Sequence, residues 1–173
     1  MTFVPKFDTK FGGPIRDNII AFLEANEADA FLWANNDQPL PPTKEWRKSI
    51  HYNTLSPVTS VVLLVTQPKQ ADDDSRIDSR HEINIVVDIQ GPKPDEQVVE
   101  AETRIRAYDA ILRNGTVDDI LAGMEVRKKC GGFDMEIGEH NYNYFYNEPT
   151  SMYRTTVFFV VTVNLFEVRH QGA

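Results

Sequence analysis

The sequence predicts an α+β fold: a mostly antiparallel four-stranded sheet with helices packed on one face and a long β-hairpin extension. Three observations predict this class. Apolar residues recur at helical spacing in two stretches, alternate at strand spacing in others, and follow the order helix, two strands, helix with a short extra helix, two strands. Because no internal repeat or low-complexity linker interrupts the chain, residues 1–173 are expected to form a single domain.

The first predicted helix begins near Pro14, which suits a first helical turn. Asn35-Asn36-Asp37 is expected to end this helix, and the prolines of residues 38–46 favour an extended or looped segment after it. The apolar residues on one face of the helix are Ile15, Ile19, Phe22 and Leu23, with Phe31 and Leu32 extending the face.

Two predicted strands follow. Residues 59–66, TSVVLLVT, are almost wholly apolar and rich in β-branched residues, as expected of a strand covered on both sides. Residues 80–91, RHEINIVVDIQG, alternate between apolar and more polar positions until Gly91-Pro92, which predicts one buried face and one face toward water, a partner or a channel. The polar residues 67–80 predict a long exposed loop between two antiparallel strands, a length that is uncommon unless the loop is functional or mobile.

The second helix has the clearest helical pattern in the chain. Asp95 is the expected N-cap, Glu96 adds an acid to the first turn, and Asn114-Gly115 supplies the stop. Thr116 is expected to open a shorter helix that runs to about Glu125. The apolar stripe of the long helix consists of Val98, Ala101, Ile105, Tyr108, Ile111 and Leu112.

Two further strands are predicted at the end of the chain. Residues 133–147, FDMEIGEHNYNYFYN, indicate a strand that runs into an aromatic segment. Residues 153–169 indicate a long strand whose first half is covered on both faces and whose second half is covered on one. Since the helices cover only one side of such a sheet, the other side must meet water or another molecule.

Composition and charge exclude several classes of protein. A net charge of −8, from 26 acidic and 18 basic residues, disfavours tight binding of nucleic acid. The richest basic run, Val126 to Cys130, holds three charges and is expected to be a solvated turn near a helix end. No run is long and apolar enough to cross a membrane, the start of the chain lacks the features of a signal peptide, and one cysteine excludes an internal disulfide. A cytoplasm-like compartment is expected.

The search for catalytic, cofactor or metal sites returns weak candidates. HEINI lacks the second histidine of a zinc-protease helix, and DDDSRID lacks the glycine and closing glutamate of a calcium loop. Asp95 with Glu125 and Arg127 is a degraded form of a nuclease pattern, in which the carboxylates should end adjacent strands. Cys130 beside Lys128 and Lys129 is expected to be inert rather than a reactive thiol. The chain is therefore expected to be no enzyme and to hold no cofactor or metal.

The segment Tyr142 to Asn147 is different, because three tyrosines and a phenylalanine crowd into five residues. The simpler interpretation is a hairpin that packs half of them against the domain. The functional interpretation is a contact with a protein or a glycan, since tyrosine offers a large rigid area with a polar tip. Glu139 and Glu148 are near enough for a sugar site.

The order of elements resembles the tail-terminator (tail-completion, head-tail joining) proteins of long-tailed bacteriophages. The segments that suggest it are PIRDNIIAFLEAN, SVVLLVT, RHEINIVVDIQG, EAETRIRAYDAIL with its closing RNG, and the two terminal strands. The resemblance implies a structural virion protein that assembles in the host cytoplasm into a homohexameric ring. Such a ring closes the head-proximal end of the tail tube, docks on the neck or connector protein, and lets DNA pass without specific binding. A closed ring needs two complementary patches on each subunit, and an acidic chain suits a passage that repels phosphates.

This reading assigns three groups of contact residues. The loop of residues 67–80 is expected to contact the tube or another ring. The aromatic segment is expected to form the subunit interface, and the polar face of the strand at residues 80–91 is expected to form the channel wall or an interface. The end of the last strand, Phe166 to Arg169, is a weaker candidate for contact between subunits. The alternatives are another tail or neck component (a tube or connector-adaptor subunit), a metal-dependent nuclease, and a glycan- or protein-binding module. The residues are Asp72, Asp73, Asp74, Arg76, Asp78 and Arg80 in the loop, Tyr142, Tyr144, Phe145 and Tyr146 in the aromatic segment, and Glu82, Asn84 and Asp88 on the face.

Overall fold

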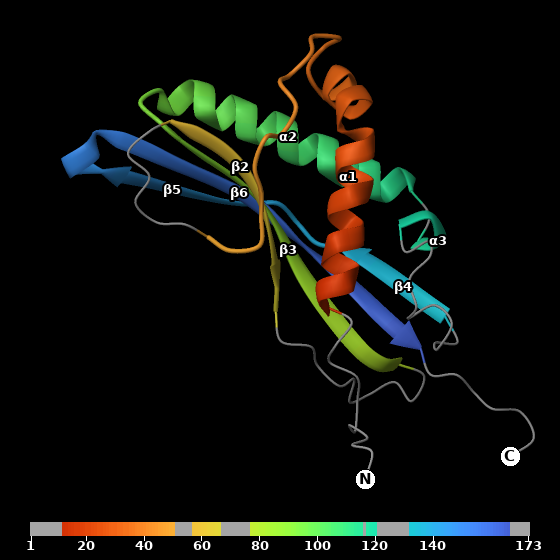
Figure 1. Cartoon of the computed structure of the whole chain (residues 1–173). Coiled ribbons are helices and arrows are strands. Elements are labelled where there is room, and N and C mark those ends of the chain that lie inside the picture. The colour runs from red at the N-terminus through yellow and green to blue at the C-terminus, as the bar shows by residue number, and fades with distance from the viewer. Residues whose placement is uncertain (1–11, 51–56, 67–76, 116, 121–131, 167–173) are drawn as a thin grey trace, which may run out of the picture.

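Two long helices lie on one face of a twisted sheet in the computed structural model, which describes residues 12–50, 57–66, 77–115, 117–120 and 132–166 (Figure 1). The helices are α1 (Gly12–Ala34) and α2 (Pro94–Asn114), followed by the short α3 (Val117–Ile120). The predicted α+β class is therefore confirmed. The predicted four-stranded sheet is wrong in detail, because the described residues form six strands, one of which runs parallel to its neighbour.

The centre of the sheet is one long antiparallel pair. β3 (Ile77–Gly91) and β6 (Met152–Phe166) pair from Ile77 opposite Phe166 to Gly91 opposite Tyr153. On the far side of β3 lies β2 (Val58–Val65), also antiparallel, and β1 (Trp46–Arg47) adds a short parallel edge to β2. β3 therefore begins within residues that the sequence assigned to a loop, because its pairing with β6 starts at Ile77 and not at Arg80.

The other side of β6 carries two strands placed end to end. β4 (Gly132–Ile137) pairs with the C-terminal half of β6, and β5 (Asn141–Asn147) pairs with its N-terminal half. Ile137 lies opposite Val161 and Asn141 lies opposite Phe158, so an advance of four residues from β4 to β5 matches an advance of three residues along β6. This is a one-residue β-bulge at Gly138–His140. The single strand predicted for residues 133–147 is thus interrupted.

The core lies between the helices and one face of the sheet. Alternate residues of β3 are buried, as the sequence predicted, and their cross-strand partners on β6 are buried with them. Both helices turn their apolar stripes toward this face, which removes those side chains from water. The core residues include Ile15, Ile19, Leu23 and Phe31 of α1, Ala101, Ile105, Tyr108 and Leu112 of α2, Ile83, Ile85, Val87 and Ile89 of β3, and Val157, Phe159, Val161 and Val163 of β6.

The helix ends follow the sequence closely, with one correction. α1 ends where predicted, and Asn36 and Asp37 adopt positive φ angles of 52° and 62°. Asp95 is not the N-cap of α2, because Lys93 occupies that position and Pro94 begins the helix. The backbone N–H of Lys93 donates to Oε1 of Gln97 at 2.9 Å, so the Gln97 side chain provides the hydrogen-bond acceptor for the N–H of the N-cap residue. The expected continuation of α3 to Glu125 and of β6 to Arg169 lies outside the described residues.

The sheet face opposite the helices is not bare at its centre, contrary to expectation. Six neighbouring side chains there are at most 7% exposed, although the described helices lie on the other face. Positions around this centre, such as Glu82 and Asn84 of β3 and Phe158 and Val160 of β6, are half-buried. Any surface for partners on this face is therefore narrower than the sequence predicted. The six residues are Ser60, Val62, Val86, Asp88, Gln90 and Thr156.

Two adjacent phenylalanines of β6 test which face carries the core. Phe159 is fully buried beneath the helices, whereas Phe158 is half-buried on the opposite face. Phe159→Ala should lower the free energy of unfolding by about 3–5 kcal/mol, because it leaves a cavity. Phe158→Ala should lower the free energy of unfolding by about 1–2 kcal/mol, because folding removes less of the apolar area of this half-buried side chain from water. Urea unfolding followed by circular dichroism gives both values, and equal losses would contradict this assignment of the faces.

Candidate functional site

β5 is the most exposed regular element among the described residues. Every residue from Asn141 to Asn147 is exposed, and the four aromatic side chains are 43–59% accessible. The strand lies at the end of the sheet away from α1 (Figure 1). The expectation that a hairpin would pack half of these rings against the domain is therefore wrong. The rings are those of Tyr142, Tyr144, Phe145 and Tyr146.

The register with β6 places the three tyrosines on one face of the hairpin. Tyr142 lies opposite Val157 and Tyr144 opposite Thr155, on the helix side of the sheet, whereas Phe145 lies opposite Arg154 on the other side. The rings of Tyr142 and Tyr144 stack with centroids 6.5 Å apart, and the ring of Tyr146 lies tilted against that of Tyr153 with centroids 4.7 Å apart. These contacts limit side-chain motion, so the tyrosines present an ordered surface that costs little entropy to bind.

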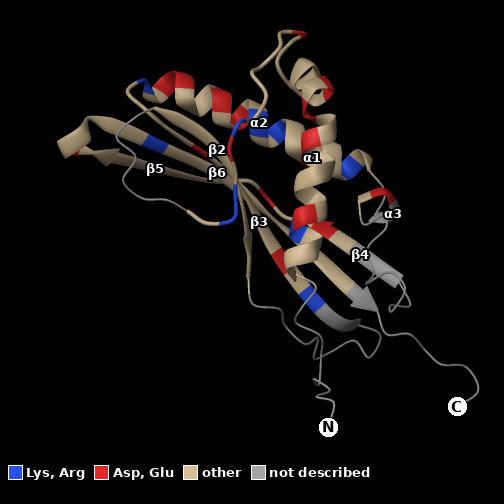
Figure 2. Cartoon of the chain, in the orientation of Figure 1, with Lys and Arg blue, Asp and Glu red and all other residues tan. Residues whose placement is uncertain are grey.

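The outer edge of β5 pairs with no strand in the described part of the chain. Natural edge strands are usually protected by lysine, proline or a bulge within them. β5 has none of these, and Figure 2 shows no charged residue along it. Charges flank it instead, at Glu139 and Glu148. Such an edge can accept a strand from another chain, with side-chain pockets on either side giving specificity.

The root of this strand is fixed to α2. Nε2 of His140, in the bulge between β4 and β5, lies 2.7 Å from Oδ2 of Asp109. The imidazole ring also lies against Phe159, with centroids 5.5 Å apart. Since Asp109 pairs with Arg113 as well, the helix holds the bulge through a charged cluster. The aromatic strand is therefore exposed but positioned.

The other predicted contact residues lie in two places. Arg80 is part of β3, where its Nε donates to Oδ1 of Asn164 at 3.0 Å, and not part of a loop. Asp88 is 1% exposed and forms two 2.9 Å bonds with Arg154, so its assignment to an accessible channel wall is wrong. Glu82 and Asn84 remain half-buried on the same face. Asp72, Asp73, Asp74 and Arg76 lie outside the described residues, as does the side chain of Asp78.

A buried polar network was not identified from the sequence. The backbone N–H of Thr43 donates to Oε1 of Glu27 at 3.0 Å, and the Tyr108 hydroxyl donates to Oε2 at 3.2 Å. Oγ1 of Thr43 lies 2.7 Å from the Tyr108 hydroxyl. These bonds tie α1, the segment after it and α2 together. The signal was present, because Glu27 lies four residues from both Leu23 and Phe31 on the apolar face.

Arg104 completes this network. Its Nη1 donates to Oγ1 of Thr43 at 3.2 Å, its Nη2 to the carbonyl of Pro41 at 3.0 Å, and its Nε to Glu100 at 3.0 Å. The guanidinium also lies over the Phe31 ring, 4.9 Å from its centroid. Thr43 thus connects Arg104 to Glu27, and the cluster positions the segment after α1.

Neither a group of metal-binding side chains among the described residues nor a known relative points to a different site. Among the described residues no group of histidine, cysteine, aspartate and glutamate could hold a metal ion, and no described helix is long and apolar enough to span a membrane. Asp95 lies exposed in the first turn of α2, while Glu125, Arg127 and Cys130 lie outside the described residues. No protein-family model matches the sequence, and no curated protein matches it either. The exposed aromatic strand is therefore the candidate site.

Removing one hydroxyl should test the buried network. Tyr108→Phe deprives Thr43 and Glu27 of a partner, so the free energy of unfolding should fall by about 1–3 kcal/mol. Tyr144→Phe removes the same hydroxyl from an exposed ring and should change stability by less than about 0.5 kcal/mol. Chemical denaturation of both variants gives the comparison. Equal effects would show that the network contributes no stability.

The same tyrosine predicts a pH dependence. Burial raises the pKa of Tyr108 well above the usual value of 10.0. Above pH 10 the unfolded chain therefore loses a proton that the folded chain keeps, and the stability contributed by this group falls as the pH rises. The stability difference between wild type and Tyr108→Phe should shrink by up to about 1.4 kcal/mol per pH unit above pH 10. A difference that stays constant from pH 9 to pH 11.5 would contradict this.

Proposed function

We propose that this chain is a structural virion protein that assembles into a ring, closes the head-proximal end of a phage tail tube and joins it to the neck. One observation carries the proposal of self-assembly: β5 presents stacked tyrosines and an unpaired edge along its whole length. The resemblance of the element order to tail-terminator proteins supplies the identity of the assembly.

The exposed strand is suited to contact between subunits. An uncharged aromatic edge is an aggregation hazard unless a partner covers it, and a neighbouring subunit in a closed ring is such a partner. Aromatic residues contribute much of the energy of protein interfaces when they become fully desolvated. Tyr142, Tyr144, Phe145 and Tyr146 are accordingly the proposed interface.

The surface charge agrees with a passage for DNA. The chain carries a net charge of −8, and acidic residues are distributed over both long helices (Figure 2). Phosphates are repelled by such a surface, so DNA can cross the ring without binding. Glu82 and Asn84, which are half-buried on the face opposite the helices, remain proposed wall or interface residues.

A charge within the aromatic strand should prevent assembly. Wild-type protein should give a monodisperse six-subunit species by native mass spectrometry and an annulus by negative-stain imaging. Tyr144→Lys should raise the concentration needed for assembly by about thirtyfold or more, because the ammonium group would be buried in the interface. Val99→Lys, at another exposed apolar position on α2, is the matched control and should assemble like wild type.

Other outcomes separate the alternatives. Long filaments formed by the protein alone would indicate a tube subunit. Magnesium-dependent cleavage of DNA that is lost in Asp95→Ala would indicate a nuclease. A stable monomer at all concentrations, or an annulus that is unchanged by Tyr144→Lys, would contradict the proposed interface.

A further inference from the structure

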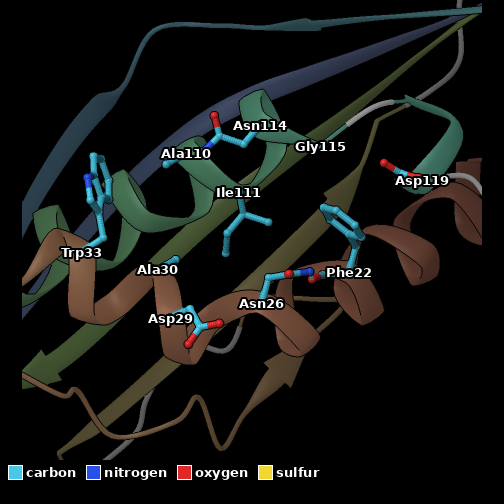
Figure 3. A pocket seen from close by; sticks show the side chains of 10 residues that line it. All are labelled: Phe22, Asn26, Asp29, Ala30, Trp33, Ala110, Ile111, Asn114, Gly115 and Asp119. Atoms are coloured by element: carbon cyan, nitrogen blue, oxygen red, sulfur yellow. Dashed lines mark hydrogen bonds between the residues drawn. The ribbon is translucent and has the colours of Figure 1, made fainter.

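A groove of about 420 Å³ lies between α1, the end of α2 and α3. In Figure 3 the side chains of Phe22 and Ile111 lie between the two long helices, with Trp33 at one end and Asp119 at the other. Gly115 closes α2 here, and a Cβ at this position would come within 2.9 Å of the Phe22 ring. The remaining lining residues are Asn26, Asp29, Ala30, Ala110 and Asn114.

One wall of the groove is a continuous stripe of α1. Phe22, Asn26, Ala30 and Trp33 follow one another at intervals of three or four residues, so they lie on one face of the helix over roughly 16 Å. Trp33 is 63% exposed at the end of this stripe, although it is among the largest apolar side chains in the chain. The stripe therefore carries apolar surface, above all at Trp33, that the described residues leave partly exposed.

The charge of the groove is of one sign. The described residues that line it include two aspartates, Asp29 and Asp119, and no lysine or arginine. Asp29 is exposed, and the face of the Trp33 ring can also attract a cation. A fitting ligand is a polypeptide segment that places a bulky apolar side chain beside a lysine or arginine.

The chain itself contains such a segment. Residues 1–11, MTFVPKFDTKF, hold two Lys-Phe pairs, Lys6-Phe7 and Lys10-Phe11, with one aspartate in a chain of net charge −8. Residues 126–130 are basic but contain no aromatic residue, and the aromatic residue of the basic stretch Lys44 to Lys48, Trp46, is half-buried against Tyr108 of its own chain. Residues 1–11 therefore combine the two chemical features that the groove selects.

We propose that the groove binds residues 1–11 of a neighbouring copy of the chain. Asp29 lies seventeen residues beyond Gly12, which is about 25 Å along α1, so the side chain of Lys10 is too short to reach it within its own subunit. A neighbouring copy can bring both Lys-Phe pairs to it. The contact is head-to-tail and closes into a ring, so it rests on the proposed self-assembly and supplies a second patch beside β5.

Charge exchange in the full-length protein tests this contact. Asp29→Lys alone, and Lys6→Glu with Lys10→Glu alone, should each raise the concentration needed for assembly about tenfold, because attraction becomes repulsion. An equimolar mixture of the two variant proteins should recover wild-type assembly, since each segment then meets a groove of opposite charge. Glu24→Lys, an exposed charge change on α1 outside the groove, is the control and should have no effect. Sedimentation velocity over a concentration series measures wild type, each variant, the mixture, and a chain that carries Asp29→Lys, Lys6→Glu and Lys10→Glu together.

The outcomes separate this contact from the proposed function. A wild-type ring that is indifferent to both charge exchanges would overturn the groove contact and leave the proposed function standing. If the charge changes weaken assembly and the mixture does not restore it, the groove contact between copies is also overturned. This includes the case in which assembly recovers only in the chain that carries all three changes, because the groove would then bind residues 1–11 of its own subunit. A wild type that never assembles would overturn both proposals.

Discussion

The antiparallel pairing of β3 with β6 is the constraint on which the rest of the structure depends. Each strand is fifteen residues long, and their register sets which side chains face the helices. A slip of one residue would put Ile85 and Phe159 on opposite faces of the sheet, so that one of them would lie where no described helix covers it. The burial of α1 and α2 therefore holds the register, and the register in turn fixes both edges of the sheet.

The β-bulge at Gly138–His140 determines which face of the sheet carries the tyrosines of β5. Without the extra residue, Tyr142 and Tyr144 would lie opposite Thr156 and Arg154, on the face away from the helices. With it, they lie on the same face as Tyr146, where Tyr142 stacks on Tyr144 and Tyr146 contacts Tyr153. Because His140 binds Asp109, the helix that covers the core also holds this bulge in place. His140 thus links the candidate interface to the core, through Asp109 of α2 and Phe159 of β6.

The sequence predicted what depends on local periodicity. Both long helices, the alternation of β3 and the stop after Ala34 follow from spacing and from turn residues that adopt positive φ. It did not predict what depends on distant partners. Asp88 follows a polar alternation, but Arg154, sixty-six residues away, pairs with it in a buried site. Glu27 and Tyr108 meet only because two helices cross.

The exposure of the aromatic strand also depends on distant partners, so the sequence alone did not predict it. Crowded tyrosines predicted either a packed hairpin or a contact surface, and only the bulge and the length of β6 decide that the rings are exposed. The groove between α1 and α2 was not identified either, because Phe22 was assigned to the core face of its helix. It lies at the edge of that face, half-buried, where the helices diverge.

Amide hydrogen exchange of β5 as a function of protein concentration tests the central claim most directly. If a neighbouring subunit covers this strand, its outward-facing amides between Asn141 and Asn147 should exchange slowly above the assembly concentration and quickly on dilution, while those of β3 stay protected in both. Exchange from β5 that is equally fast at every concentration would contradict the claim that this edge joins one copy of the chain to the next.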